Sequence, residues 1–290
     1  MRQMITRTAA LYAALAAFVA AAPCPATAGF GDPSRAAEFV ELRAALGTTG
    51  RTPEQLHETF VIGTNHASQV KPIDEQIAAI RGYISDRLAG NGPVDLGDLG
   101  PLQQQVATLQ GQHDALDLEW TIAIRAILTP DQIARAAAQH QKRAAVEATD
   151  KQFIPSSLPE PIREPNDLYG DKLGFTRGVA LTDAQKEQMA TLKAASARVD
   201  SVIQLKYAAV RDQIRDQLAS TAAITLPQLA PLQQKASTLK SQHDAERLRL
   251  AIQIRALLTP AQLDRGADLH LQLAALAQEN ALLDQNKSGN

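Results

Sequence analysis

Apolar and small side chains recur at steps of three and four residues along residues 182–220, a stretch without glycine or proline. This spacing places them on one face of an α-helix and predicts a single long helix. Residues 51–89 repeat the pattern, but Pro72 interrupts it, so we expect a kink or break near Lys71. The stripe of the uninterrupted stretch consists of Met189, Leu192, Ser196, Val199, Ile203, Tyr207, Val210, Ile214 and Leu218.

A second pair of helices is predicted from about Leu99 to Ile127 and from about Leu229 to Leu257. The turn signal Asn91-Gly92-Pro93 precedes the first of them. Trp120 lies on its apolar stripe, and we interpret it as a core residue. Its stripe consists of Leu102, Val106, Leu109, His113, Leu116, Trp120, Ile124 and Ile127.

The chain contains an internal repeat. Residues 51–147 align without a gap with residues 181–277, and 37 of the 97 pairs are identical. A repeat of this length indicates a duplicated structural unit. Residues 148–180 between the copies contain several prolines and predict a linker without regular structure, and residues 278–290 predict a polar tail.

A short motif marks the start of two helices in each copy. In Leu128-Thr129-Pro130-Asp131-Gln132, the threonine oxygen can accept from a free N–H of the new helix, and the glutamine can reach back to the threonine N–H. This reciprocal arrangement is a capping box. The four predicted boxes are Thr52 with Gln55, Thr129 with Gln132, Thr182 with Gln185, and Thr259 with Gln262.

Residues 1–28 have the pattern of a secretory signal peptide. Two arginines precede an apolar run, and Ala26-Thr27-Ala28 is a small-residue cleavage site, so we expect cleavage after Ala28. Cys24, the only cysteine, leaves with this segment, and Pro23 before it fits a lipid-attachment site poorly. No other apolar run is long enough to span a membrane. The predicted protein is exported, without disulfides.

Charge and motif content argue against several functional classes. Without residues 1–28 the chain keeps 27 basic residues (29 − 2) and 31 acidic ones, a net charge of −4. This balance gives no electrostatic basis for nucleic-acid binding. There is no nucleophile–base motif, glycine-rich phosphate loop or HExxH helix, so we expect neither an enzyme nor a bound cofactor.

The signal peptide, the helical units and the LTxxQ motifs together resemble the Spy/CpxP family of bacterial periplasmic proteins. The matching segments are residues 128–132, 181–185 and 258–262, whereas Arg51 replaces the leucine of the first box. The resemblance implies an antiparallel helical hairpin that dimerises into a thin curved cradle, and a periplasmic ATP-independent chaperone or envelope-stress binding protein. Its partners would be unfolded or misfolded envelope proteins.

The predicted fold class is all-α, with two tandem antiparallel hairpin units of three or four helices each. Two fused copies of a dimerising unit can form an elongated, cradle-like pseudo-dimer within one chain. Repeat 1 has a net charge of −4 and repeat 2 of +3. Asp117 corresponds to Arg247, and Glu119 to Arg249, so opposite charges could meet at a pseudo-two-fold axis. Drift on solvated faces explains these differences equally well.

Candidate client-binding residues lie on the first long helix of each repeat, where apolar positions are flanked by charge. In a thin cradle only one face of this helix is buried, and the other would bind unfolded chains. The more common interpretation of such a stripe is core packing. The candidates are Arg81, Ile84, Leu88, Arg211, Ile214 and Leu218.

His113 and His243 are retained between the copies, lie on apolar stripes and each precede an aspartate. Two such histidines could bind zinc across an interface, with carboxylates as further ligands. The alternative is a core histidine satisfied by a hydrogen bond. Relatives in the same superfamily bind zinc, nickel or cobalt, so a metal sensor or resistance protein is the alternative function. An adaptor for an envelope partner is a third.

Overall fold

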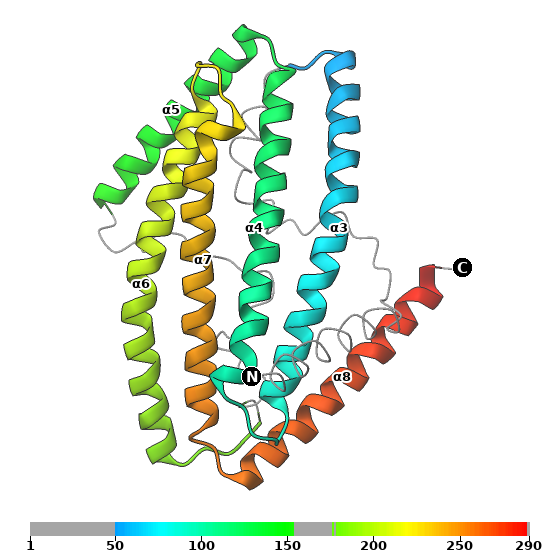
Figure 1. Ribbon diagram of the computed structural model, residues 1–290, viewed down its shortest axis with the longest axis vertical. Helices are drawn as coiled ribbons and strands as arrows, with labels where there is room; N and C mark the ends of the chain where they lie inside the picture. Colours follow the sequence, from blue (N-terminus) through cyan, green and yellow to red (C-terminus); the bar gives the residue numbers. More distant parts are fainter. Residues whose placement is uncertain (1–49, 154–175, 177, 289–290) are drawn as a thin grey trace, which may run out of the picture. The chain divides into compact units, whose positions relative to one another are not determined.

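The structure is a computed structural model that describes residues 50–153, 176 and 178–288. All regular elements in this part of the chain are helices (Figure 1), which confirms the predicted all-α class. None of the described helices is long and apolar enough to cross a membrane. The helices are α3 (Pro53–Ala89), α4 (Leu96–Ala126), α5 (Pro130–Phe153), α6 (Asp183–Ala219), α7 (Leu226–Arg255) and α8 (Pro260–Ser288).

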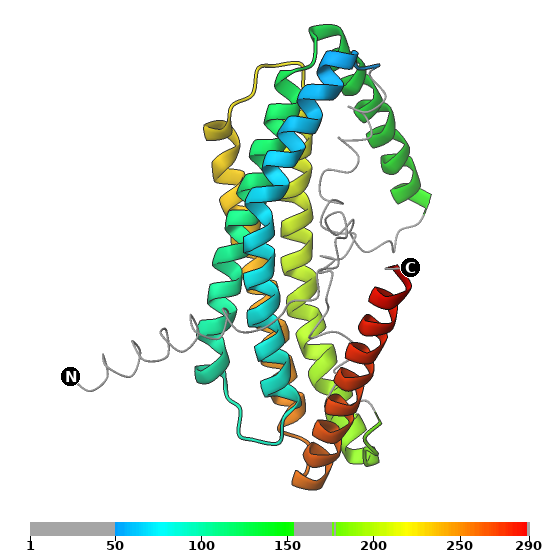
Figure 2. The ribbon, with the colours of Figure 1, turned by 90° about the vertical axis from the view of Figure 1, so that its right-hand side faces the viewer.

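Contacts divide the chain within α8. One compact unit holds α3 to α7 and the beginning of α8 up to His270, and α8 from Leu271 onward belongs to a second unit. In the first unit α3 packs along α4, and α6 packs along α7. α4 packs along α7, and these two helices run in opposite directions (Figure 1). α5 leaves the four long helices at an angle (Figure 2).

Of the kink or break expected near Lys71, the break does not occur, because α3 continues through Pro72 and contains 37 residues, as α6 does. Proline removes one backbone hydrogen bond from a helix. Both Lys71 and Pro72 are exposed, so water can bond the freed carbonyl. The buried residues that follow, among them Ile77 and Ile80, hold the rest of α3 in the core.

α4 and α7 begin three residues earlier than predicted, at Leu96 and Leu226. The Asp95 side chain accepts from the Asp98 N–H at 2.8 Å and caps α4. At the start of α7, the Thr225 N–H donates to the Gln228 side chain at 2.8 Å. Pro101 and Pro231 both lie inside these helices.

Two predicted irregular segments are partly helical. α5 runs to Phe153, so residues 148–153 belong to a helix and not to the linker. α8 runs to Ser288, so most of the predicted tail is also helical. Neither extension contains glycine or proline, and each helix ends shortly before the next one, Pro155 or Gly289. Residues 154–175 and 177 of the linker, and the predicted signal peptide, lie outside the described residues.

The hydrophobic core mixes the two repeats. One cluster joins Leu118 and Ile124 of repeat 1 to Ile214 and Leu218 of repeat 2. The other joins side chains of α3 and α4 to those of α7, including Leu248, which is completely buried. Because both clusters combine side chains from the two copies, neither repeat encloses its apolar face with its own residues alone.

Candidate functional site

The predicted capping boxes form at all four positions. At the start of α3 the Thr52 N–H donates to Gln55 Oε1 at 3.0 Å, and the Gln55 N–H donates to Thr52 Oγ1 at 3.3 Å. At the start of α5, the same bonds join Thr129 and Gln132 at 2.8 and 3.3 Å. The corresponding pairs are Thr182 with Gln185 at α6 and Thr259 with Gln262 at α8.

The two boxes of each repeat also bind each other, which the motif alone does not reveal. Gln55 and Gln132 exchange side-chain amide hydrogen bonds at 2.9 Å. The second amide hydrogen of Gln55 reaches the Ile127 carbonyl at 2.7 Å, and that of Gln132 reaches the Gly50 carbonyl at 3.1 Å. Every donor of these two amide groups is therefore used, and the pair joins the start of α3 to the turn before α5.

Gln185 and Gln262 form the same pair in repeat 2, at 2.7 and 2.9 Å. We expect Gln185→Ala to lower the free energy of unfolding by about 1–2 kcal/mol, because its removal leaves buried or half-buried polar groups without partners. Combined with Gln262→Ala, the loss should be smaller than the sum, with a coupling of about 1 kcal/mol. Urea unfolding of both single variants and the double variant measures it.

Gln188→Ala is the matched control, because this exposed residue lies one turn further along α6. Its effect should stay within about 0.5 kcal/mol. Fully additive losses for Gln185 and Gln262 would show that the amide pair contributes nothing beyond the separate caps.

Arg125, near the end of α4, caps a helix of the other repeat. Its Nε donates to the Leu218 carbonyl at 3.0 Å, and Nη2 donates to the Ser220 and Ala222 carbonyls at 2.6 and 2.7 Å. These carbonyls lie at and just beyond the end of α6, where the helix dipole favours a cation. Arg125 is 7% exposed, so the contact is largely shielded from water.

Arg255 makes the reciprocal contact. Its Nε donates to the Leu88 carbonyl at 3.0 Å, and Nη2 donates to the Gly90 and Gly92 carbonyls, both at 2.6 Å. Burial lowers the pKa of both arginines, and the charge of nearby Arg87 lowers that of Arg255 further. An arginine nevertheless remains charged in a protein. Each repeat thus places a buried cation on the end of the other's first helix.

Sequence reasoning missed these arginines, although it contained a signal. The segments Ile124-Arg125-Ala126 and Ile254-Arg255-Ala256 retain the same cation between apolar residues in both copies. A charge retained at a core-facing helical position must find a buried partner. Only the packing of α4 against α7 shows that the partners are backbone carbonyls of the other repeat.

Further polar contacts cross between the repeats. His140 Nε2 lies 2.9 Å from Asp216 Oδ1, and the equivalent His270 Nε2 lies 2.9 Å from Asp86 Oδ1. Lys240 Nζ also lies 3.5 Å from Asp114 Oδ1. Arg81 Nη2 lies 4.0 Å from Asp244 Oδ2. The lysine and arginine pairs join opposite charges across the interface between the repeats.

The opposite-charge pairs expected from Asp117 against Arg247 and Glu119 against Arg249 do not form. Asp117 contacts His66 and His113 of its own repeat, and Arg249 pairs with Glu246 of its own helix. The substitutions at these equivalent positions therefore changed contacts inside each repeat.

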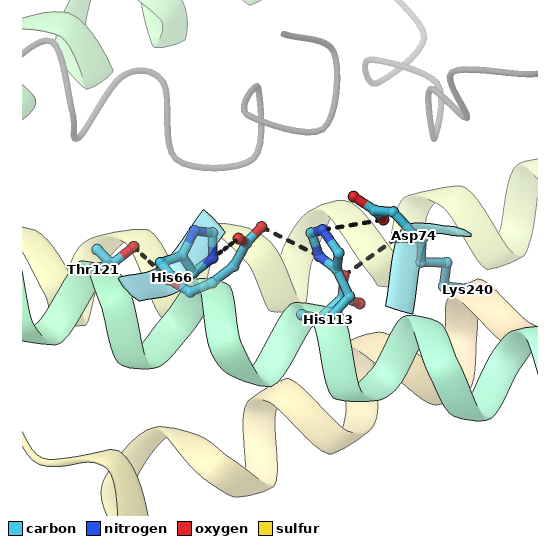
Figure 3. A network of polar contacts seen from close by, with 7 residues as sticks. His66, Asp74, His113, Thr121 and Lys240 are labelled. Atoms are coloured by element: carbon cyan, nitrogen blue, oxygen red, sulfur yellow. Dashed lines mark hydrogen bonds and ion pairs between the residues drawn. The ribbon is translucent and has the colours of Figure 1, made fainter. Parts of the chain in front are cut away.

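His113 belongs to a polar network between α3 and α4 (Figure 3). Its Nε2 lies 3.5 Å from Asp74, and its Nδ1 lies 3.7 Å from Asp117. The other oxygen of Asp117 lies 2.7 Å from Nε2 of His66, whose ring stacks on Trp120 at 5.2 Å. His113 therefore faces carboxylates on both sides, which fits a core histidine with polar partners.

His243 is completely buried and contacts Asp200 through Nδ1, while its Nε2 has no hydrogen-bond partner among the described residues. Burial raises the pKa of Asp200, but the hydrogen bonds from His243 and Gln204 and the charges of His243 and Arg247 outweigh this effect. The net pKa lies below the usual value. Within the described ranges, no three His, Cys, Asp or Glu side chains converge as metal ligands would.

The expectation that the client-binding candidates are open to solvent is wrong for five of the six. Ile84 is 0% exposed, and Arg81, Leu88, Ile214 and Leu218 are also buried. Arg211 is half-buried, and its guanidinium carbon lies 5.7 Å from the centre of the Tyr207 ring. The alternative interpretation, core packing, is the one the burial supports. Packing of one repeat on the other covers the faces that a lone hairpin would leave open.

Comparison with known proteins finds no matching family model, no matching characterised relative and no matching solved structure. The resemblance to the Spy/CpxP family therefore stays a prediction that rests on the LTxxQ motifs.

Large apolar side chains remain exposed outside the core. They occur on α3 at Leu56 and Phe60, on α6 at Val199, Val202 and Leu205, and in the last part of α8. Sequence periodicity placed Val199 on the apolar stripe, but it is 49% exposed, and it did not single out the other positions. They are the surfaces on which the protein can bind another chain.

Proposed function

We propose that the protein is an exported, periplasmic, ATP-independent chaperone or envelope-stress binding protein that shields apolar segments of unfolded proteins. Three features support the proposal: the predicted signal peptide, the LTxxQ resemblance and a helix segment with several exposed leucines. The third carries it, because binding of an unfolded chain requires apolar surface that the protein does not itself bury.

This segment is the part of α8 that follows His270. Leu271, Leu273, Leu276 and Leu282 are between 49% and 67% exposed. Leucines at this density on a solvated helix are unusual, since isolated exposed apolar residues are normal but a series of them marks an interaction surface. A helix with several exposed leucines can bind an apolar segment of another chain through these side chains.

Repeat 1 has this feature only in part, because exposed Val146 stands at the position equivalent to Leu276. Gln141 and Arg143 stand at the positions equivalent to Leu271 and Leu273, although α5 and α8 start from identical capping boxes. The leucines are therefore not required for the shared fold of the two repeats. Their presence in only one copy favours a binding role for the end of α8.

Suppression of aggregation tests the proposal. A chemically unfolded, aggregation-prone protein is diluted into buffer containing the processed chain and no nucleotide, and light scattering is followed. We expect suppression at near-stoichiometric ratios. The double variant Leu271→Gln, Leu273→Arg, which copies repeat 1, should lose about half or more of this suppression, because it removes apolar contact area.

Val199→Gln with Leu205→Glu is the matched control, since it introduces the residues of repeat 1 on α6. It should retain suppression if α8 is the binding element. Absence of suppression by the unaltered chain, even in several-fold excess, would refute the chaperone proposal. Equal losses in both double variants would refute the assignment to α8.

We also propose that the two repeats act as the two halves of a dimer within one chain. The reciprocal caps of Arg125 and Arg255, and the reciprocal pairs of His140 and His270, support this proposal. Contacts that occur twice, exchanged between equivalent residues, are what a two-fold interface produces.

The alternative function as a metal sensor or resistance protein has less support. His113 and His243 contact carboxylates, but among the described residues no three His, Cys, Asp or Glu side chains are arranged so that they could hold a metal ion. A zinc site needs three or four converging ligands. Both histidines fit the role of polar core residues better.

A further inference from the structure

The carboxylate of Asp117 lies between two histidine rings in the middle of the α3–α4 pair. Its Oδ1 lies 2.7 Å from His66 Nε2, and its Oδ2 lies 3.7 Å from His113 Nδ1. Asp117 is 5% exposed, so little water reaches its charge. A buried carboxylate is costly unless a positive charge lies beside it. A histidine supplies that charge only when it is protonated, so this contact depends on pH.

Carboxylates of both helices lie close to His113. Asp74 of α3 has its Oδ1 3.5 Å from His113 Nε2 (Figure 3). On α4, Asp117 contacts the other ring nitrogen, and the buried Asp114 follows His113 directly in the sequence. A proton on His113 therefore places a positive charge beside carboxylates of both helices.

The other helix packed against α4 is α7, which also carries charged side chains. They interact with carboxylates or cations other than Asp117, which leaves the two histidines as the charge partners of Asp117 among the described residues. The pairs that involve α7 are Lys240 with Asp114 at 3.5 Å, Asp244 with Arg81 at 4.0 Å, and Arg247 with Asp200.

Repeat 2 has a permanent charge at the equivalent site. Arg247 stands at the position of Asp117 and interacts with the carboxylate of Asp200. His243 also contacts Asp200, but an arginine keeps its charge throughout the physiological pH range. In repeat 1, by contrast, the positive charge beside Asp117 has to come from histidine. The other exchanged residues are Ser196 in place of His66 and Gln204 in place of Asp74.

The part of α3 that carries this network has few other anchors. No described side chain of residues 56–76 is buried, whereas Gln55 before them and Ile77 after them are. His66 is half-buried, and the centre of its ring lies 5.2 Å from that of Trp120 of α4, on which it stacks. A change in one polar contact therefore affects residues 56–76 more than the deeply buried end of α3.

We propose that His66, Asp117 and His113 form a pH-sensitive device that tightens residues 56–76 of α3 on α4 in mild acid and loosens them at alkaline pH. Loosening uncovers the ring of Trp120. The occupant of this face is α3 itself, and the inference does not depend on the proposed chaperone function.

The direction follows from the charges. A protonated histidine has a buried carboxylate as its neighbour when α3 lies on α4, and only water when the segment is open. The closed form therefore gains stability as the pH falls through the range in which histidines titrate, about 5 to 8, and loses it as the pH rises. Below about pH 4 the carboxylates themselves take up protons, and the gain disappears.

Hydrogen exchange of the processed full chain tests the proposal. Protection is measured at pH 6 and pH 8, each relative to an unstructured peptide of the same sequence. Amides of residues 56–76 should be at least about fivefold better protected at pH 6, whereas the equivalent residues 186–206 of α6 should change by less than about twofold. Equal protection of residues 56–76 at the two pH values would overturn the proposal.

Three variants assign the effect. His66→Ser introduces the residue of repeat 2, and Asp117→Asn removes the charge at nearly constant shape, so each should reduce the pH difference to less than about twofold. His57→Gln is the matched control, because His57 is an exposed histidine on the same helix, and it should leave the difference unchanged. A full pH difference in folded Asp117→Asn, or its loss in His57→Gln, would contradict the assignment.

Fluorescence gives a second readout that needs no unfolding. Trp120 is the only tryptophan of the chain, and it stacks on the His66 ring, so its emission reports the charge of that ring. The emission of the unaltered chain should change in one step between about pH 5 and 8. His66→Ser should abolish the step, and His57→Gln should keep it. Emission that stays constant over this range in the unaltered chain would overturn the proposal even if a variant failed to fold.

Discussion

Replacement of Arg255 by methionine is expected to lower the free energy of unfolding by about 3 kcal/mol or more, because three backbone carbonyls lose a charged donor at once. The bonds to Leu88, Gly90 and Gly92 are 2.6 to 3.0 Å long, and the guanidinium is largely buried. Methionine fills a similar volume but cannot donate. Urea denaturation followed by circular dichroism measures the loss.

Arg125→Met should have a similar effect, because the two arginines make equivalent contacts. Arg125 lies near the end of α4 and Arg255 at the end of α7, two helices that run in opposite directions (Figure 1). The two arginines bond different carbonyls, so the double variant should show additive losses. Arg249→Met on α7 is the control, since its pair with Glu246 is half-exposed and should contribute less than about 1 kcal/mol. A loss below that of the control would contradict the capping role.

Truncation of Ile84 or Ile214 to alanine is expected to lower the free energy of unfolding by about 2–4 kcal/mol, through lost apolar burial and the cavity left behind. Both side chains are at most 3% exposed, and they occupy equivalent positions in the two mixed core clusters. Urea unfolding measures the loss, with one slope of the free energy of unfolding against urea concentration fitted to all variants. Suppression of aggregation at a temperature where the variants stay folded should be unchanged.

Tyr83→Ala is a suitable control for the first of these, because it removes a large apolar side chain next to Ile84 that is 48% exposed. Its cost should be far smaller. If Ile84→Ala left the stability unaltered and instead weakened suppression of aggregation, Ile84 would be a client-binding residue and the core assignment would be wrong.

Local features of the fold were predictable. The boundaries of α6 and the four threonine–glutamine boxes follow from backbone hydrogen bonding within a few residues, so sequence spacing is enough to locate them. At Pro72 the sequence predicted a kink or a break, and the helix is not broken there. A local rule states the cost of an interior proline, but it does not include the buried side chains that hold both halves of α3 in place.

The candidate sites were less predictable. An apolar stripe on a helix has the same periodicity whether it faces a core or a client, so Ile84 and Ile214 could not be classified before their burial was known. The retained histidines were equally ambiguous, because His113 contacts carboxylates that lie both four residues and 39 residues away in the sequence. Only the second contact depends on how α3 and α4 align.

The sequence by itself determined the helical class, the duplication and the helix starts, since these depend on periodicity, identity between copies and bonds within one turn. The tertiary structure decided which apolar faces are closed and where Arg125 and Arg255 bind. Both depend on contacts between residues more than 90 positions apart, such as Arg125 with Leu218. Such contacts arise because each repeat completes the burial of its apolar face against the other, and no local pattern specifies that register.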